Sequence, residues 1–84
     1  MNISREEQRV LHALAQGGRI RHFREGGRIV AADCITRDGY RLAGFALATL
    51  TRLRRRGLVA SRGGQPYRIS PKGLGAVRAQ PDNR

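Results

Sequence analysis

The sequence predicts a small α+β domain with a winged-helix-like arrangement. Apolar residues recur at helical spacing in three segments, and short β-rich runs separated by glycine-containing turns lie between them. The predicted order of elements is α-β-β-β-α-β-β-α. A chain of 84 residues buries only about 60% of its unfolded surface, which leaves room for a single thin core. We therefore expect one basic domain over residues 1–80 and a short C-terminal tail over residues 81–84.

The first predicted helix begins after Ser4. Glu7 follows Ser4 by three residues, which is the spacing of a capping box. Apolar side chains then recur at helical spacing over residues 10–14, before a Gly-Gly pair at 17–18 ends the run. This helix is expected to serve packing.

A small antiparallel meander is predicted between the first two helices. Its three strands are residues 19–24, 28–36 and 40–42, with turns at Gly26–Gly27 and Asp38–Gly39. An Asp-Gly pair favours a tight hairpin because both turn positions need positive φ.

A second helix is predicted over residues 43–56, with Gly57 in the stop position. Its apolar side carries Leu42, Phe45, Ala46, Leu50 and Leu53. The opposite side carries a stripe of small side chains that ends in a guanidinium, made by Gly44, Ala48, Thr51 and Arg55. Four arginines crowd positions 52–56, either as a binding surface or as a solvated helix end that suits the helix dipole.

The last third of the chain resembles the back half of a winged helix-turn-helix domain. A strand at 57–61, a basic turn at 62–66 and a strand at 67–70 precede a helix with Ser70 as N-cap and Pro71 at its first position. In that fold family a helix enters the major groove and the wing contacts phosphate or the minor groove. The sequence departs from the pattern because no second helix is evident before residue 43.

The charge is large and unevenly placed. The chain carries 17 Lys and Arg against 6 Asp and Glu, for a net charge of +11. Residues 1–40 contribute +2 and residues 41–84 contribute +9. Such a one-sided field attracts polyanions, with nucleic acid first and acidic protein or anionic lipid surfaces second.

Other classes of protein are disfavoured by the sequence. No apolar run suits a membrane span or a signal peptide, so we expect a cytoplasmic location and no membrane partner. Lone Cys34 offers neither a disulfide nor a zinc site, and no cofactor, metal or small-molecule substrate is expected. His12 and His22 with Tyr40 leave a metal-free ribonuclease open as an alternative, but no catalytic motif is present and we expect no enzyme.

Both ends of the chain resemble the small bacterial YjhX family of toxins. The resemblance rests on residues 1–5, 7–9, 11–12, 14–15 and 17–20 and on residues 64–69, 73–74, 77–80 and 82–84. It implies a non-enzymatic toxin of a toxin-antitoxin pair that inhibits bacterial DNA topoisomerase I by binding the enzyme, the DNA or both. It also implies a cognate antitoxin. The alternative is a winged-helix DNA-binding transcriptional regulator.

In either case the binding residues are expected in the basic C-terminal half. The predicted contact residues are Thr51, Arg52, Arg54, Arg55, Arg56, Arg62, Arg68 and Lys72.

Overall fold

A computed structural model describes residues 2–78 of the chain. The elements follow one another as α1 (Arg5–Ala15), β1 (Arg19–Glu25), β2 (Arg28–Ile35), α2 (Leu47–Arg55), β3 (Val59–Ala60), β4 (Arg68–Ile69) and α3 (Pro71–Arg78). Strands β1 and β2 form one antiparallel sheet, and β3 and β4 form another. The predicted α+β class is confirmed, while the predicted tail at 81–84 lies outside the described residues.

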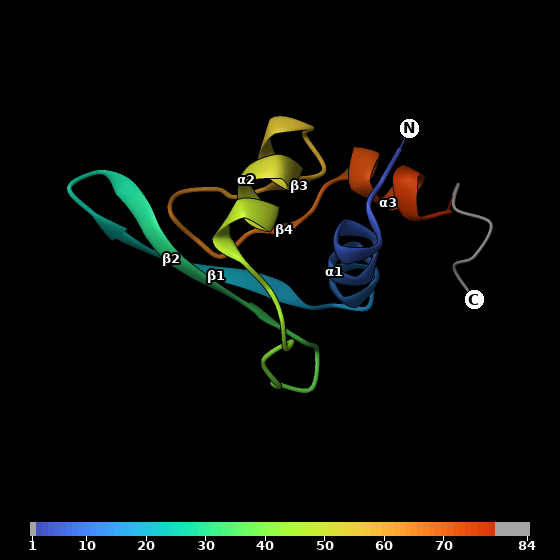
Figure 1. Ribbon diagram of the computed structural model, residues 1–84, viewed down its shortest axis with the longest axis horizontal. Helices are drawn as coiled ribbons and strands as arrows, with labels where there is room; N and C mark the ends of the chain where they lie inside the picture. The colour runs from blue at the N-terminus through green and yellow to red at the C-terminus, as the bar shows by residue number, and fades with distance from the viewer. Residues whose placement is uncertain (1, 79–84) are drawn as a thin grey trace.

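The β1–β2 hairpin is long and projects from the rest of the molecule (Figure 1). In this view α2 lies above the hairpin, and α1 and α3 lie together at the other end. The two hairpins are joined by a single bridge, in which Ile20 and Tyr67 exchange backbone hydrogen bonds of 2.9 and 2.8 Å. This bridge fixes the basic second hairpin against the base of the first.

One hydrophobic core holds these elements together. Helix α1 contributes Val10, Leu11 and Leu14. The other buried members are Ile20, Cys34, Leu50, Leu53, Leu58, Val59, Tyr67 and Val77. A single core is therefore shared by helices α1, α2 and α3 and by both hairpins. No helix in residues 2–78 has the length and apolar character needed to cross a membrane.

The predicted capping box of α1 is confirmed. Ser4 Oγ accepts a hydrogen bond of 3.0 Å from the Glu7 backbone N–H, and Glu7 Oε1 accepts one of 3.0 Å from the Ser4 N–H. Two of the four unpaired donors at the start of the helix are thereby satisfied.

The prediction of a third strand at residues 40–42 is wrong. Residues 40–42 form an isolated bridge between Arg41 and Ile35 instead of a strand, because the chain turns away at residues 43–44, where Gly44 is left-handed, and the pairing ends at Leu42. The observed order is therefore α-β-β-α-β-β-α.

Helix α2 begins four residues later than predicted. Gly44 has a φ of 78° and Ala46, the N-cap, is extended, so the backbone becomes helical only at Leu47. Gly44 consequently lies outside the helix, and the predicted stripe of small residues on α2 starts at Ala48.

The back half matches the predicted arrangement of helix, short hairpin and helix. Ser70 caps α3, since its Oγ accepts a hydrogen bond of 3.0 Å from the Gly73 N–H, and Pro71 is the first helical residue. The same hydroxyl donates to the Gly57 carbonyl at 2.7 Å, which fixes α3 to the end of α2. Between α1 and α2 the structure has a hairpin and no helix.

Candidate nucleic-acid and partner-binding surface

The end of α2 is fixed by a glycine-terminated cap. Gly57 is left-handed, its N–H donates to Arg54 at 3.0 Å, and the Leu58 N–H donates to Leu53 at 3.0 Å. These two bonds are the pair that defines a Schellman motif. The cap turns the chain so that Leu58 enters the core while the arginines of the last helical turn stay at the surface.

The eight predicted contact residues lie on four neighbouring segments of the basic half. Thr51, Arg52, Arg54 and Arg55 are on α2, and Arg56 is its C-cap. Arg62 lies in the β3–β4 turn, Arg68 on β4 and Lys72 on α3. These eight residues divide into two groups, because some of them make contacts within the chain and others do not.

Arg52 and Arg56 belong to the first group, since both approach the buried Glu7. Arg56 Nη1 lies 3.7 Å from Glu7 Oε1, and Arg52 Nε lies 3.9 Å from Glu7 Oε2. Arg56 also donates to the backbone carbonyl of Asn2, and Arg52 donates to Thr49 Oγ1 at 3.4 Å. Two of the four clustered arginines therefore join the end of α2 to the start of α1.

Glu7 keeps its negative charge in this environment. Its side chain is 2% exposed, and burial alone raises the pKa of the carboxyl. The hydrogen bonds with Ser4 and the charges of Arg56 and Arg52 outweigh burial, so the pKa of Glu7 lies below its usual value. Sequence reasoning identified Glu7 as a cap but missed these ion pairs, which join residues 45 and 49 positions apart in the chain.

Arg68 also makes contacts within the chain. Its Nη1 donates to the carbonyls of Gly17 and Gly18 at 3.1 and 3.2 Å. Both carbonyls follow the C-terminus of α1, so this guanidinium fixes β4 to the turn that leads into β1.

Arg54 lies over an aromatic ring. Its guanidinium carbon is 5.6 Å from the centre of the Tyr67 ring, and His22 meets the same ring edge-on at 5.1 Å. A guanidinium stacked in this way keeps its planar edge available for a phosphate or carboxylate.

Thr51, Arg54 and Arg55 line one shallow depression on α2, of about 320 Å³. Thr51 Oγ1 donates to the Leu47 carbonyl at 3.2 Å, so the hydroxyl oxygen remains free to accept a bond. The depression is open, and two of its three lining residues are arginines. It suits a small anionic group at the surface better than an enclosed ligand.

Arg55, Arg62 and Lys72 are exposed and have no hydrogen bond or ion pair with residues 2–78. Lys72 reaches the end of α2, because a β-carbon placed on Gly57 would lie 3.9 Å from Lys72 Cδ. We give the name α2–wing surface to these residues of α2, the adjoining β3–β4 turn and the start of α3: Thr51, Arg54, Arg55, Arg62 and Lys72. No acidic residue occurs between positions 39 and 81, so local carboxylates do not neutralise this surface.

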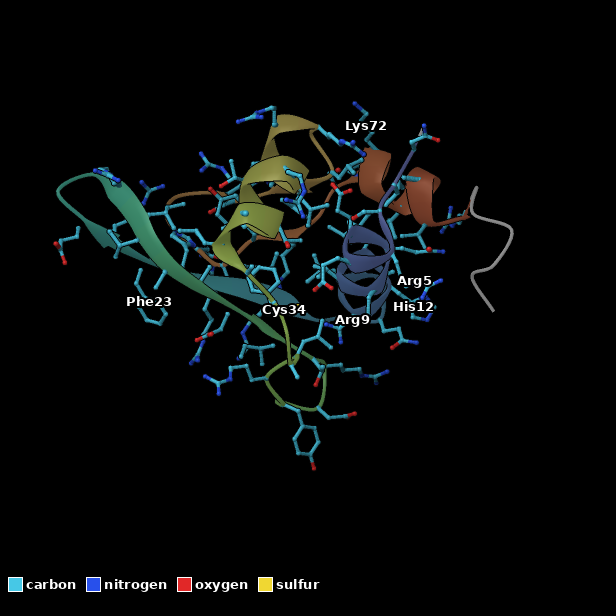
Figure 2. The ribbon with its side chains drawn as sticks, viewed as in Figure 1. Arg5, Arg9, His12, Phe23, Cys34 and Lys72 are labelled. Atoms are coloured by element: carbon cyan, nitrogen blue, oxygen red, sulfur yellow. The ribbon has the colours of Figure 1, made fainter. Side chains whose placement is uncertain are left out.

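His12, His22 and Cys34 lie in different environments. His12 is exposed on α1 beside Gln16, while His22 packs on Tyr67 from β1. Cys34 is fully buried, and burial outweighs the nearby charge of Arg9 to raise the pKa of its thiol to about 11. Figure 2 labels Cys34 among the packed elements and His12 at the surface. Within residues 2–78, no three His, Cys, Asp or Glu side chains gather as a metal site would require.

Comparison with known proteins gives one consistent result. A family profile described as "putative toxin of bacterial toxin-antitoxin pair" matches residues 1–84. A UPF0386 protein of Brucella anthropi is 60% identical over 84 residues and covers 100% of both chains. UPF0386 proteins of Rhodospirillum centenum and Beijerinckia indica are 56% and 58% identical over 85 residues, covering 100% of this chain and 99% and 100% of their own. No solved structure matches the chain.

Proposed function

The chain belongs to the YjhX family of toxins from bacterial toxin-antitoxin pairs, and we propose that it inhibits bacterial DNA topoisomerase I. It does so by binding the enzyme, its DNA or both, without chemistry of its own. A cognate antitoxin follows from the family, whereas the topoisomerase and DNA are proposed partners.

The α2–wing surface is the single observation that carries this proposal. Arg55, Arg62 and Lys72 have no carboxylate partner among residues 2–78 and lie on elements fixed to one another by Ser70 and the Gly57 cap. Cations without a partner in the chain gain most from meeting phosphates or carboxylates, because little side-chain interaction within the protein is lost on binding. Such a surface can occupy the nucleic-acid path of an enzyme or cover an acidic part of it.

The direct test is relaxation of supercoiled plasmid by purified bacterial topoisomerase I, with this protein titrated in. The same titration is repeated with a large excess of linear competitor DNA. Inhibition that survives the competitor places the target on the enzyme, and inhibition that the competitor removes places it on DNA. Absence of inhibition in both conditions contradicts the proposal.

Charge reversal locates the binding surface. The variant Arg55→Glu/Arg62→Glu should lose most of the inhibition, because two favourable contacts become repulsive. Arg5→Glu/Arg78→Glu changes the net charge equally at exposed arginines on α1 and α3 and is the matched control. Equal loss in both variants would show that net charge matters and this surface does not. Arg52 and Arg56 are unsuitable for this test because they bind Glu7.

The α2–β3–β4–α3 order supports the regulator as a second candidate, because its Gly63–Gly64 turn resembles a wing tip. A regulator requires sequence preference. Competition between promoter and random DNA for the bound protein would reveal that preference, and equal competition would argue against regulation.

A further inference from the structure

The projecting β1–β2 hairpin has an unexplained exposed aromatic surface. Phe23 is 48% exposed, and Tyr40, in the turn after β2, is 73% exposed. With Val30, at 46%, they are the large hydrophobic residues that the described chain leaves exposed. The whole sequence has only two Phe and two Tyr, so half of these rings face solvent in this region. Exposed apolar side chains that gather in one region of a surface commonly mark a binding site.

Phe23 lies on the face of β1 that turns away from the core. Ile20 is buried and His22 packs on Tyr67, so strand alternation places Arg21 and Phe23 on the other face. Figure 2 shows the Phe23 side chain pointing away from the hairpin on the side opposite α2. The aromatic surface is therefore separate from the α2–wing surface.

An arginine lies over the Phe23 ring. The Arg21 guanidinium carbon lies 5.9 Å from the centre of the ring, and Arg21 Nη2 lies 3.3 Å from Asp33 Oδ2 on the paired strand. The ion pair neutralises Asp33 and orients the guanidinium beside the ring. A ring backed by a cation and half exposed can accept a second flat group on its open side.

The charges around these rings favour a polyanion. Residues 19–41 carry six arginines and three acidic residues, namely Arg19, Arg21, Arg24, Arg28, Arg37 and Arg41 against Glu25, Asp33 and Asp38. A second copy of the chain is disfavoured as the partner, since each copy carries a net charge of +11. Single-stranded nucleic acid fits both features, because its bases stack on rings and its phosphates meet arginines.

The two rings are spaced along the hairpin. Phe23 pairs with Ala31, while Ile35 bridges to Arg41, the residue after Tyr40. Four residues of strand separate these two pairings, which corresponds to about 14 Å. In Figure 1 the turn that follows β2 lies on the side of the hairpin away from α2, which is also the side to which Phe23 points. The two positions are therefore separated by a length that a strand of a few nucleotides can span.

We propose that this side of the β1–β2 hairpin, together with the turn after β2, binds single-stranded DNA by stacking bases on Phe23 and Tyr40, with the neighbouring arginines contacting phosphates. The choice of DNA over RNA rests on the proposed action at a DNA topoisomerase. The stacking of bases on these rings does not depend on that proposed function. The surface would hold an unpaired strand while the α2–wing surface contacts the enzyme or a duplex.

The test is the affinity of the full chain for fluorescein-labelled (dT)12 and for a 12-base-pair duplex, followed by fluorescence anisotropy at low salt. Phe23→Ala should weaken (dT)12 binding about 5- to 150-fold, the range expected for loss of one stacked base, and leave duplex affinity within about two-fold. Val30→Ala removes an equally exposed aliphatic side chain from the same hairpin and should change neither affinity.

A second variant gives a direct readout of stacking. The chain contains no Trp, so Phe23→Trp introduces a single indole that keeps a flat ring at this site. Its fluorescence should be quenched by (dT)12 over the same concentration range as the anisotropy change. Thermal unfolding followed by circular dichroism checks that each variant folds.

Several results would overturn the proposal. One is undetectable (dT)12 binding by the wild type. Another is the combination of Phe23→Ala binding (dT)12 within about two-fold of the wild type and Phe23→Trp showing no quenching by (dT)12. Tighter binding of (rU)12 than of (dT)12 would overturn the assignment to DNA. If Phe23→Ala lost topoisomerase inhibition but kept (dT)12 binding, the face would be a protein-docking site. Failure here leaves the proposed function intact, because Arg55→Glu/Arg62→Glu tests the α2–wing surface separately.

Discussion

Glu7 has two structural roles in this chain. It completes the capping box with Ser4, and its buried carboxylate receives the charges of Arg52 and Arg56. The arginines stay partly exposed, with side chains 46% and 38% accessible, so water still screens each ion pair. The stabilising effect of Glu7 therefore comes from several modest contacts on one buried group.

Replacing Glu7 tests this role. Glu7→Gln keeps an acceptor for the Ser4 N–H but removes the charge that faces the two arginines, and we expect a loss of about 1–3 kcal/mol in the free energy of unfolding. Urea unfolding at pH 7 measures this loss. Glu6→Gln is the matched control, because the Glu6 side chain is 38% accessible and pairs with Arg9 at 3.3 Å, and the substitution should cost less than about 1 kcal/mol.

The same group predicts how stability depends on pH. The pKa of Glu7 in the folded chain lies below its ordinary value of 4.5, so its contribution is fully present above that value. The contribution is lost as the pH falls through the lowered folded pKa. Wild type should therefore lose more stability than Glu7→Gln on acidification from pH 5. Parallel losses would contradict the ion-pair assignment.

At the scale of elements, the sequence predicted the starts of those helices that have a capping residue. The Ser4–Glu7 spacing predicted α1, and Ser70–Pro71 predicted the start of α3, because a cap involves residues only three positions apart. The start of α2 could not be predicted in this way, since Ala46 offers no side-chain acceptor and the left-handed Gly44 interrupts an apparently helical pattern.

The uncapped start of α2 can be improved. Ala46 is exposed and extended, as an N-cap should be, but makes no side-chain hydrogen bond. Ala46→Ser should stabilise the chain by about 1 kcal/mol, or roughly 4–8 °C in the unfolding temperature. Ala48→Ser, an exposed change within α2, should not stabilise it. Equal shifts in calorimetry would show that the hydroxyl acts elsewhere than at the cap.

Across the whole molecule, the sequence predicted the basic half but not which cations are available. The counts alone placed +9 on residues 41–84. The structure then assigns Arg52 and Arg56 to Glu7 and Arg68 to the turn after α1, through contacts between residues 45 to 51 positions apart. Contacts at such separation depend on the tertiary fold, so no local pattern could reveal them. For the same reason the exposure of Phe23 was not foreseen.

This division between engaged and available cations determines the expected salt dependence of duplex binding. Four cations of the α2–wing surface are free to meet phosphates: Arg54, Arg55, Arg62 and Lys72. Each phosphate contact contributes about −0.9 to the slope of log K against log salt, so the wild type should show a slope of about −4. Arg55→Gln/Arg62→Gln should reduce its magnitude by about 2, because two contacts are removed without adding repulsion. Anisotropy titrations from 50 to 300 mM KCl would measure both slopes. A wild-type slope of about −6 would instead mean that Arg52, Arg56 and Arg68 leave their internal partners to bind DNA. Glu7→Gln would then strengthen binding, because it would free Arg52 and Arg56.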